Sequence, residues 1–271
     1  MKFLIFLILA TFTLNSQSIE YFPNNLNVQP FSANFLEPKV GFLFQTGKNE
    51  LRLDIGNSRD IIHYSGKNYS SSFGVDFFTF TKLSGEGEFH FPVNAIDYLF
   101  GVNLSYKSFS ENTSYGFRFR LSHISAHFVD GHYDNPTAMW KNGRYPRVYS
   151  REFIEVFPYI ESEYFRSYIG YTYLFHVVPK DLGRHIFQFG TEYYLNDFKF
   201  LNVTPFVAYD LKLAKINVFE GTNSINAGLK FGKHDGAGFS LMLNYYSGRS
   251  VHGEYFDYYD KYTSVSFNFD L

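Results

Sequence analysis

The 271-residue sequence contains no cysteine, a single tryptophan and only 18% charged residues. Without cysteine the chain has no disulfide framework, no thiolate metal site, no cysteine nucleophile and no lipid-modified N-terminal cysteine. The 24 basic residues are balanced by 26 acidic ones, so there is no basic surface for nucleic acid and we expect no nucleic-acid partner. Beyond the first 18 residues, no uncharged apolar stretch approaches the roughly 20 residues of a membrane-spanning helix.

Aromatic residues, in contrast, are abundant. They make up 21% of the chain, with 34 phenylalanines and 23 tyrosines. Hydrophobic residues reach 45%, yet the mean hydropathy is -0.20, so apolar residues are dispersed among polar neighbours rather than gathered in blocks. This composition argues against disorder and indicates a fold with a large aromatic surface.

The first 18 residues match the pattern of a secretory signal peptide. Lys2 precedes an apolar run over 3–14, and the small residues Ser16 and Ser18 occupy positions -3 and -1 of a cut after Ser18. We therefore predict a signal peptide over 1–18, an N-terminal extension over 19–37 and a single β-domain over 38–271. The alternative for the apolar run is a buried N-terminal strand or helix.

The rest of the chain alternates apolar and polar residues with period two, which indicates strands. In 115–122, Tyr115, Phe117 and Leu121 fall on one face, whereas Arg118 and Arg120 fall on the other. The same pattern predicts strands at 39–46, 51–64, 73–82, 95–107, 114–126, 149–161, 165–176, 185–195, 199–211, 224–232, 237–247 and 261–271.

Alternation alone does not separate a soluble sandwich or lipocalin-like barrel from a membrane barrel. The apolar face is too rich in phenylalanine and tyrosine to pack easily inside one soluble core, but it suits a lipid-facing band. Short connections near 108–113, 162–164, 196–198 and 233–236 alternate with longer ones near 127–148, 177–184, 212–223 and 248–260. We therefore predict an all-β fold, a closed antiparallel transmembrane β-barrel of about twelve strands in the bacterial outer membrane.

The C-terminal residues 265–271 form an alternating strand that runs to the last residue. They resemble the C-terminal signal of bacterial outer-membrane proteins, although Leu271 stands where the usual residue is phenylalanine. The resemblance implies recognition of this strand by the outer-membrane assembly machinery.

The polar face predicts an enclosed interior of mixed charge, with Arg118, Arg120, Glu192, Asp210 and Lys212 among its residues. Such charges either pair to fill the lumen or line a narrow pore. Our leading hypothesis for function is accordingly a non-catalytic role in the envelope, either structural or as a narrow pore.

One segment could carry chemistry. His123, Ser125 and His127 lie near the end of a predicted strand, and the run 150–152 opens the next one. Here the chain resembles a bacterial family known as domain of unknown function 1207, whose members carry a His-x-Ser-Ser-His-type run followed by Ser-Arg-Glu. Ala126 replaces the second serine of that run, and the segments 168–171 and 190–193 are also similar. The resemblance implies an outer-membrane-type barrel and no particular activity.

The His-x-Ser pair also resembles the motif of outer-membrane lipid A deacylases. That resemblance implies His123 as base, Ser125 as nucleophile and a glutamate that orients the histidine, for which Glu152 is the first candidate and Glu155 the second. Residues i and i+2 of a strand share a face, so His123 and Ser125 are expected to point toward membrane lipid, the expected partner. The alternative function is therefore a lipid acyl hydrolase, and the competing interpretation is that these residues only bond the neighbouring loop.

A metal site built from His123, His127, Asp130 and His132 is a further alternative. Their spacing matches no tight ligand pattern on a defined element. We therefore predict neither a metal nor another cofactor.

Overall fold

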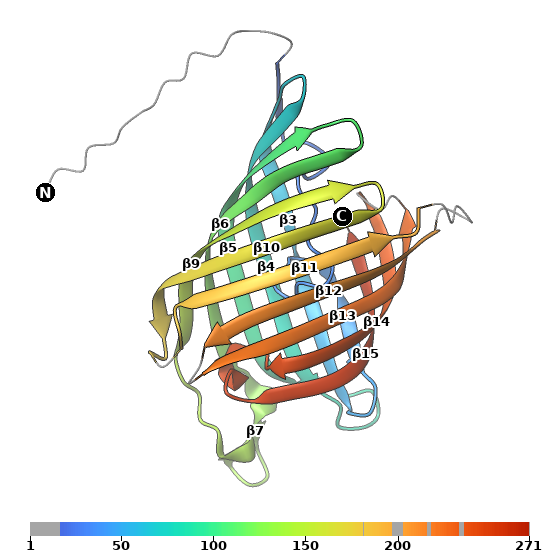
Figure 1. The fold of residues 1–271 in the computed structure, drawn as a ribbon. Helices are drawn as coiled ribbons and strands as arrows, with labels where there is room; N and C mark the ends of the chain where they lie inside the picture. The colour runs from blue at the N-terminus through green and yellow to red at the C-terminus, as the bar shows by residue number, and fades with distance from the viewer. Residues whose placement is uncertain (1–16, 181, 197–202, 216–217, 233–235, 271) are drawn as a thin grey trace, which may run out of the picture.

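The computed structural model describes residues 17–180, 182–196, 203–215, 218–232 and 236–270. Within these ranges twelve antiparallel strands form a barrel (Figure 1). In chain order they are β2 (Val40–Gln45), β3 (Glu50–Ser65), β4 (Tyr69–Ser84), β5 (Val93–Phe109), β6 (Thr113–Phe128), β9 (Tyr149–Ser162), β10 (Phe165–Val178), β11 (His185–Tyr194), β12 (Val203–Lys215), β13 (Phe219–Gly232), β14 (Gly238–Arg249) and β15 (Tyr259–Asp270). Each strand pairs with its neighbours in sequence, and β15 pairs with β2, which closes the sheet. The predicted closed barrel is confirmed.

Smaller elements lie at the two ends of the barrel. Strand β1 (Ser18–Tyr21) pairs with the end of β3, and β7 (Tyr133–Asp134) pairs with β8 (Met139–Trp140) in a loop hairpin. Three single-turn 3₁₀ helices, η1 (Asp130–His132), η2 (Lys141–Gly143) and η3 (Gly253–Tyr255), also lie in loops. Among the described residues, no helix has the length and apolar character needed to cross a bilayer.

The alternating sequence pattern sorts residues between the two faces of the wall as predicted. On β6, Tyr115, Phe117 and Leu121 are exposed on the outside, whereas Arg118 and Arg120 are buried inside. Outward phenylalanines also stack between strands, for example Phe231 on Phe239 with ring centroids 4.5 Å apart. The aromatic content of the chain is therefore largely a property of its outer surface.

The two ends of the barrel differ in their connections. The turns 66–68, 110–112 and 163–164 gather at one end, which we call the short-turn end, and the connections 129–148 and 250–258 lie at the opposite, long-loop end (Figure 1).

One predicted loop was wrong: the long connection expected at 212–223 is only the three residues 216–218. The reason is that β12 continues to Lys215 and β13 begins at Phe219, so alternation persists on both sides of the turn. The connection after β11 spans 195–202, longer than the short turn expected at 196–198, and most of it lies outside the described residues.

The C-terminal strand forms as predicted. Strand β15 runs to Asp270 and pairs with β14 on one side and with β2 on the other. Leu271 lies outside the described residues, as do residues 1–16 of the predicted signal peptide.

The N-terminal extension lies inside the barrel. After β1 the chain leaves the wall, passes through the lumen as an irregular segment over 22–39, which we call the plug, and returns to the wall as β2 (Figure 1, blue). Phe31 in the plug is fully buried, and its ring stacks on that of Tyr168 with centroids 3.9 Å apart. The guanidinium carbons of Arg118 and Arg166 lie 4.8 and 4.7 Å from the Phe31 ring centroid.

Charged residues of the wall and plug neutralise one another at the centre of the lumen. Arg120 lies 3.0 Å from Glu37 of the plug, 3.0 Å from Asp76 and 2.9 Å from Glu155. Arg118 also pairs with Glu37. Because buried charges are tolerated only when paired, this network explains why both signs occur on the inward face.

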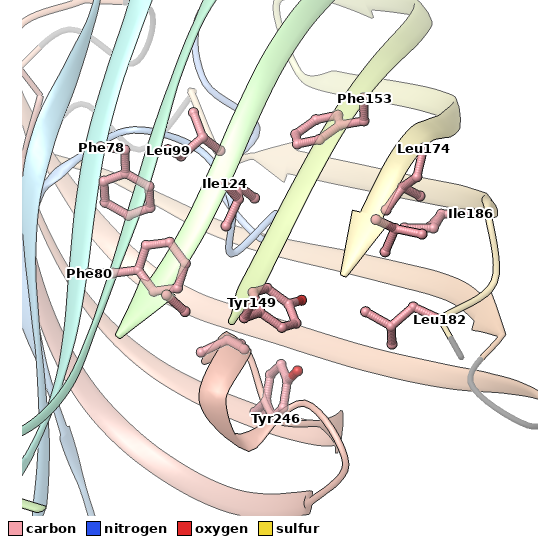
Figure 2. Close-up of a cluster of buried hydrophobic side chains, with 13 residues drawn as sticks. Phe78, Phe80, Leu99, Ile124, Tyr149, Phe153, Leu174, Leu182, Ile186 and Tyr246 are labelled. Atoms are coloured by element: carbon pink, nitrogen blue, oxygen red, sulfur yellow. The ribbon is translucent and has the colours of Figure 1, made fainter. Parts of the chain in front are cut away.

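The long-loop end of the lumen is apolar. Side chains from several strands converge there, as Figure 2 shows, and they include Phe78, Leu99, Ile124 and Phe153. Loop 250–258 folds over this cluster, with Val251 and His252 buried.

Candidate functional site

The candidate site is a row of polar side chains on the outer face of the wall, near its long-loop end. Strand pairing places Glu152 of β9 between His123 of β6 and His176 of β10. The side chains of His123 and Glu152 are only 27% and 28% exposed, whereas that of His176 is 59% exposed. The sequence therefore builds a His–Glu–His row across three neighbouring strands.

Hydrogen bonds fix the carboxylate of this row from three sides. The Nδ1 atom of His123 lies 2.7 Å from Glu152 Oε1, and the hydroxyl of Ser150 donates to the same oxygen at 3.2 Å. The Nδ1 atom of His176 bonds the other carboxylate oxygen. With Nδ1 of His123 engaged by the carboxylate, its Nε2 is the nitrogen able to act as a base.

A second row, made of the hydroxyl groups of Ser125 and Ser150, lies two residues closer to the long-loop end along strands β6 and β9. Ser125 of β6 is paired with Ser150 of β9, and both share the outward face with His123 and Glu152. Within the described part of the chain, no hydrogen bond joins the Ser125 hydroxyl to His123. Catalytic hydrogen bonds are often long in the absence of substrate, so the shared face is the relevant observation.

Aromatic side chains flank the two rows. Phe100 of β5 is paired with His123, and their ring centroids are 4.9 Å apart. Tyr98 is paired with Ser125, and its ring lies 6.2 Å from that of His127. The polar cluster is therefore set in an apolar surface.

Of the two glutamates predicted to orient the histidine, the structure brings Glu152 to His123 and places Glu155 on the opposite face. Glu155 points into the lumen, where it pairs with Arg120 and accepts a hydrogen bond from Thr172. Glu155 lies three positions after Glu152, and an odd spacing along a regular strand changes face. Glu155 as the orienting residue was therefore wrong.

The residues of the alternative metal site do not gather. His132 is buried among the loops of the long-loop end, stacked on Phe128 with ring centroids 3.8 Å apart, whereas His127 is exposed on the outside. Across the described ranges, no group of three or more histidine and acidic side chains is placed to hold a metal ion.

Sequence reasoning missed two members of the site, His176 and Ser150. His176 is not among the residues singled out from the sequence, because strand pairing across β9 and β10 is needed to bring it to Glu152. Ser150 was noted only as part of the run 150–152, although its i, i+2 spacing from Glu152 could have indicated a shared face.

The fold defines a barrel of the outer-membrane type. It is similar to outer membrane phospholipase A from Escherichia coli, with a TM-score of 0.56 and 13% identity over 89% of this chain and 93% of that one. It is also similar to the Salmonella typhi outer membrane phospholipase dimer with bound calcium, with a TM-score of 0.53 and 11% identity over 86% of this chain and 91% of that one. At such identities the likeness concerns the fold alone.

The family is shown by sequence. The family model described as protein of unknown function (DUF1207) matches residues 91–270, which is more than half of the chain. The chain belongs to this family. LpxR from Salmonella typhimurium is a more distant structural match, with a TM-score of 0.35 and 12% identity over 82% of this chain and 88% of that one. No curated protein matches the sequence.

Proposed function

We propose that this protein is an outer-membrane barrel that hydrolyses acyl esters of membrane lipid on its outer wall, with Ser125 as nucleophile, His123 as base and Glu152 as the group that orients His123. The observation that carries the proposal is the 2.7 Å contact between Glu152 and Nδ1 of His123, with Ser125 two residues along on the same face. A carboxylate on Nδ1 leaves Nε2 free to accept a proton, as in serine hydrolases.

The chemistry requires only the side chains of the two rows and water. The Ser125 hydroxyl attacks the ester carbonyl while His123 Nε2 takes its proton, and collapse of the tetrahedral intermediate expels the alcohol, which receives that proton. Water then attacks the acyl-serine with His123 again as base, releasing the fatty acid and restoring Ser125. Glu152 stabilises the imidazolium in both halves of the reaction.

The position of the site favours a lipid substrate. In a bilayer the outward aromatic surface faces lipid, and the row lies near the long-loop end, which is the outer end of an outer-membrane barrel. Tyr98 and Phe100 lie beside the site, and outer-membrane barrels carry girdles of aromatic residues at the boundary between headgroups and acyl chains. The ester bonds of a lipid lie at this depth.

Location and assembly belong to the same proposal. Export rests on the predicted signal peptide over 1–18, and delivery to the outer membrane rests on strand β15 as the segment that the assembly machinery recognises. The second candidate function, a sealed structural barrel, is favoured by the paired charges between the plug and the wall. In that case the His–Glu–His row only ties together three strands.

Replacement of Ser125 separates the two functions. We expect the purified wild-type protein to release fatty acid from vesicles that contain phospholipid or lipid A, and Ser125→Ala to lower kcat by about 1,000-fold or more. A fluorophosphonate should label Ser125, as located by mass spectrometry.

The control is Ser167→Ala, which removes an outward serine whose hydroxyl lies 2.8 Å from that of Thr191 near the short-turn end. It should keep full activity. Equal activity of the wild-type and Ser125→Ala proteins, with both folded, would exclude the hydrolase and leave the structural role.

A further inference from the structure

The pairing of β9 with β10 contains one irregularity, and it lies at the candidate site. Leu174 pairs with Phe153, but the next pair joins His176 to Glu152, so Phe175 is an extra residue in β10. In a regular strand His176 would share the inward face of Leu174. Instead Phe175 and His176 are both exposed on the outside, and alternation resumes with the buried Val177.

A bulge of this kind changes the direction of the side chains that follow it, and bulges are common beside active sites. Here the change brings the Nδ1 atom of His176 to the Glu152 oxygen that His123 does not use. The hydroxyl of Ser150 and Nδ1 of His123 occupy the other oxygen. The carboxylate is therefore fixed in its plane, with Oε1 directed at His123.

We infer that His176 is a positioning residue of the proposed hydrolase: the bulge at Phe175 turns it outward, where its Nδ1–H holds Glu152 in the orientation that His123 requires. The inference rests on the proposed function. His176 has no nucleophile beside it on β10, since the residue two positions further along its strand is Val178. Its role is therefore exerted through the carboxylate and not on the substrate.

The test compares two replacements of His176 in the vesicle assay. His176→Leu removes the donor and should lower kcat about tenfold with KM unchanged, because substrate binding is not altered. His176→Asn places an amide N–H near the position of Nδ1 and should restore kcat to within about threefold of the wild type. In a Glu152→Ala background His176→Leu should have no further effect, because residues that act as one unit are not additive.

His185→Leu is the matched control, since His185 is an outward histidine on the next strand that bonds Tyr171. It should leave kcat unchanged. Heat-modifiable gel mobility verifies that every variant is a folded barrel.

The outcomes distinguish the two claims. If Ser125→Ala abolishes activity but His176→Leu retains it fully, or if His176→Leu still lowers kcat tenfold in the Glu152→Ala background, the positioning role is overturned and the hydrolase stands. If Ser125→Ala is as active as the wild type, both claims are overturned.

Discussion

At the scale of single residues, Glu37 of the plug is a buried carboxylate shared between two buried arginines of the wall. It is 1% exposed and accepts hydrogen bonds from Arg118 and Arg120, whose own side chains are 5% and 1% exposed. A carboxylate between two guanidinium groups is stable inside a protein only while all three remain together. Glu37 therefore links the plug to the wall.

Removing that charge should weaken the whole barrel. We expect Glu37→Gln to destabilise the folded state by about 3 kcal/mol, because two buried guanidinium groups lose a shared partner. Unfolding in urea, followed by loss of the fast-migrating band on unboiled gels, measures this. Glu111→Gln, an exposed glutamate in the turn 110–112, is the control and should be neutral within about 0.5 kcal/mol. Equal urea midpoints for the two variants would contradict a structural role for Glu37.

At the scale of elements, loop 250–258 behaves as a lid on the long-loop end. The side chains of Arg144 and Arg147, from the connection 129–148, donate to the backbone carbonyl of Glu254 at 3.0 and 2.8 Å and to Asp257 at 2.8 and 3.0 Å. The Glu254 side chain is buried under this clamp, and burial raises its pKa to about 7. The closed loop therefore favours the protonated form of Glu254.

The stability of this lid should consequently depend on pH. The contribution of Glu254 is fully present below its ordinary pKa of 4.5 and is lost as pH rises through about 7, since ionisation is then forced on a buried carboxyl group. Proteolysis within 250–258 should therefore accelerate from pH 5 to pH 8, and Glu254→Gln should reduce that dependence.

Asp257 of the same loop should have the opposite pH dependence to Glu254. Burial opposes its ionisation, but hydrogen bonds from Arg144 and Arg147 hold the pKa of Asp257 below its usual value. The stabilising effect of the ionised Asp257 is therefore present at neutral pH and lost under acid, so Asp257→Asn should loosen the loop most at pH 7.

The Glu254 prediction has its own contradicting outcome. If the cleavage rate of Glu254→Gln depends on pH in the same way as that of the wild type, burial of Glu254 is not the cause of the pH dependence.

At the scale of the whole molecule, the lumen is filled at its centre and at its long-loop end. The plug and paired charges occupy the centre, and the apolar cluster with loop 250–258 covers the long-loop end. A cavity of about 1,020 Å³ opens at the short-turn end, and plug residues including Gln29 and Phe31 line it.

A filled barrel should not conduct ions. We expect the purified protein in a planar bilayer to show no single-channel steps, because the plug, the paired charges and the apolar cluster occupy the lumen. Discrete steps that persist in independent preparations would contradict the filled lumen and restore the narrow pore as a function.

Much of the architecture was predictable because a barrel wall has two chemically different faces. Alternation on β6 separated Phe117 from Arg118, and the same parity placed His123 and Ser125 outward. Parity also shows in retrospect that Glu155 had to face inward. The ends of strands were predicted wrongly where the alternation of apolar and polar residues does not mark where a strand stops. This is the case at 212–223, where strand and connection residues have similar composition.

The sequence by itself determined the strand period and the sorting of aromatic and charged residues between the two faces, because both depend on spacing along a strand. Only the tertiary structure decided that the plug enters the lumen, that Glu37 meets Arg118 and Arg120, and that His176 reaches Glu152. These contacts join segments far apart in the chain, or depend on one bulged residue. Local patterns carry no information about them until the sheet closes.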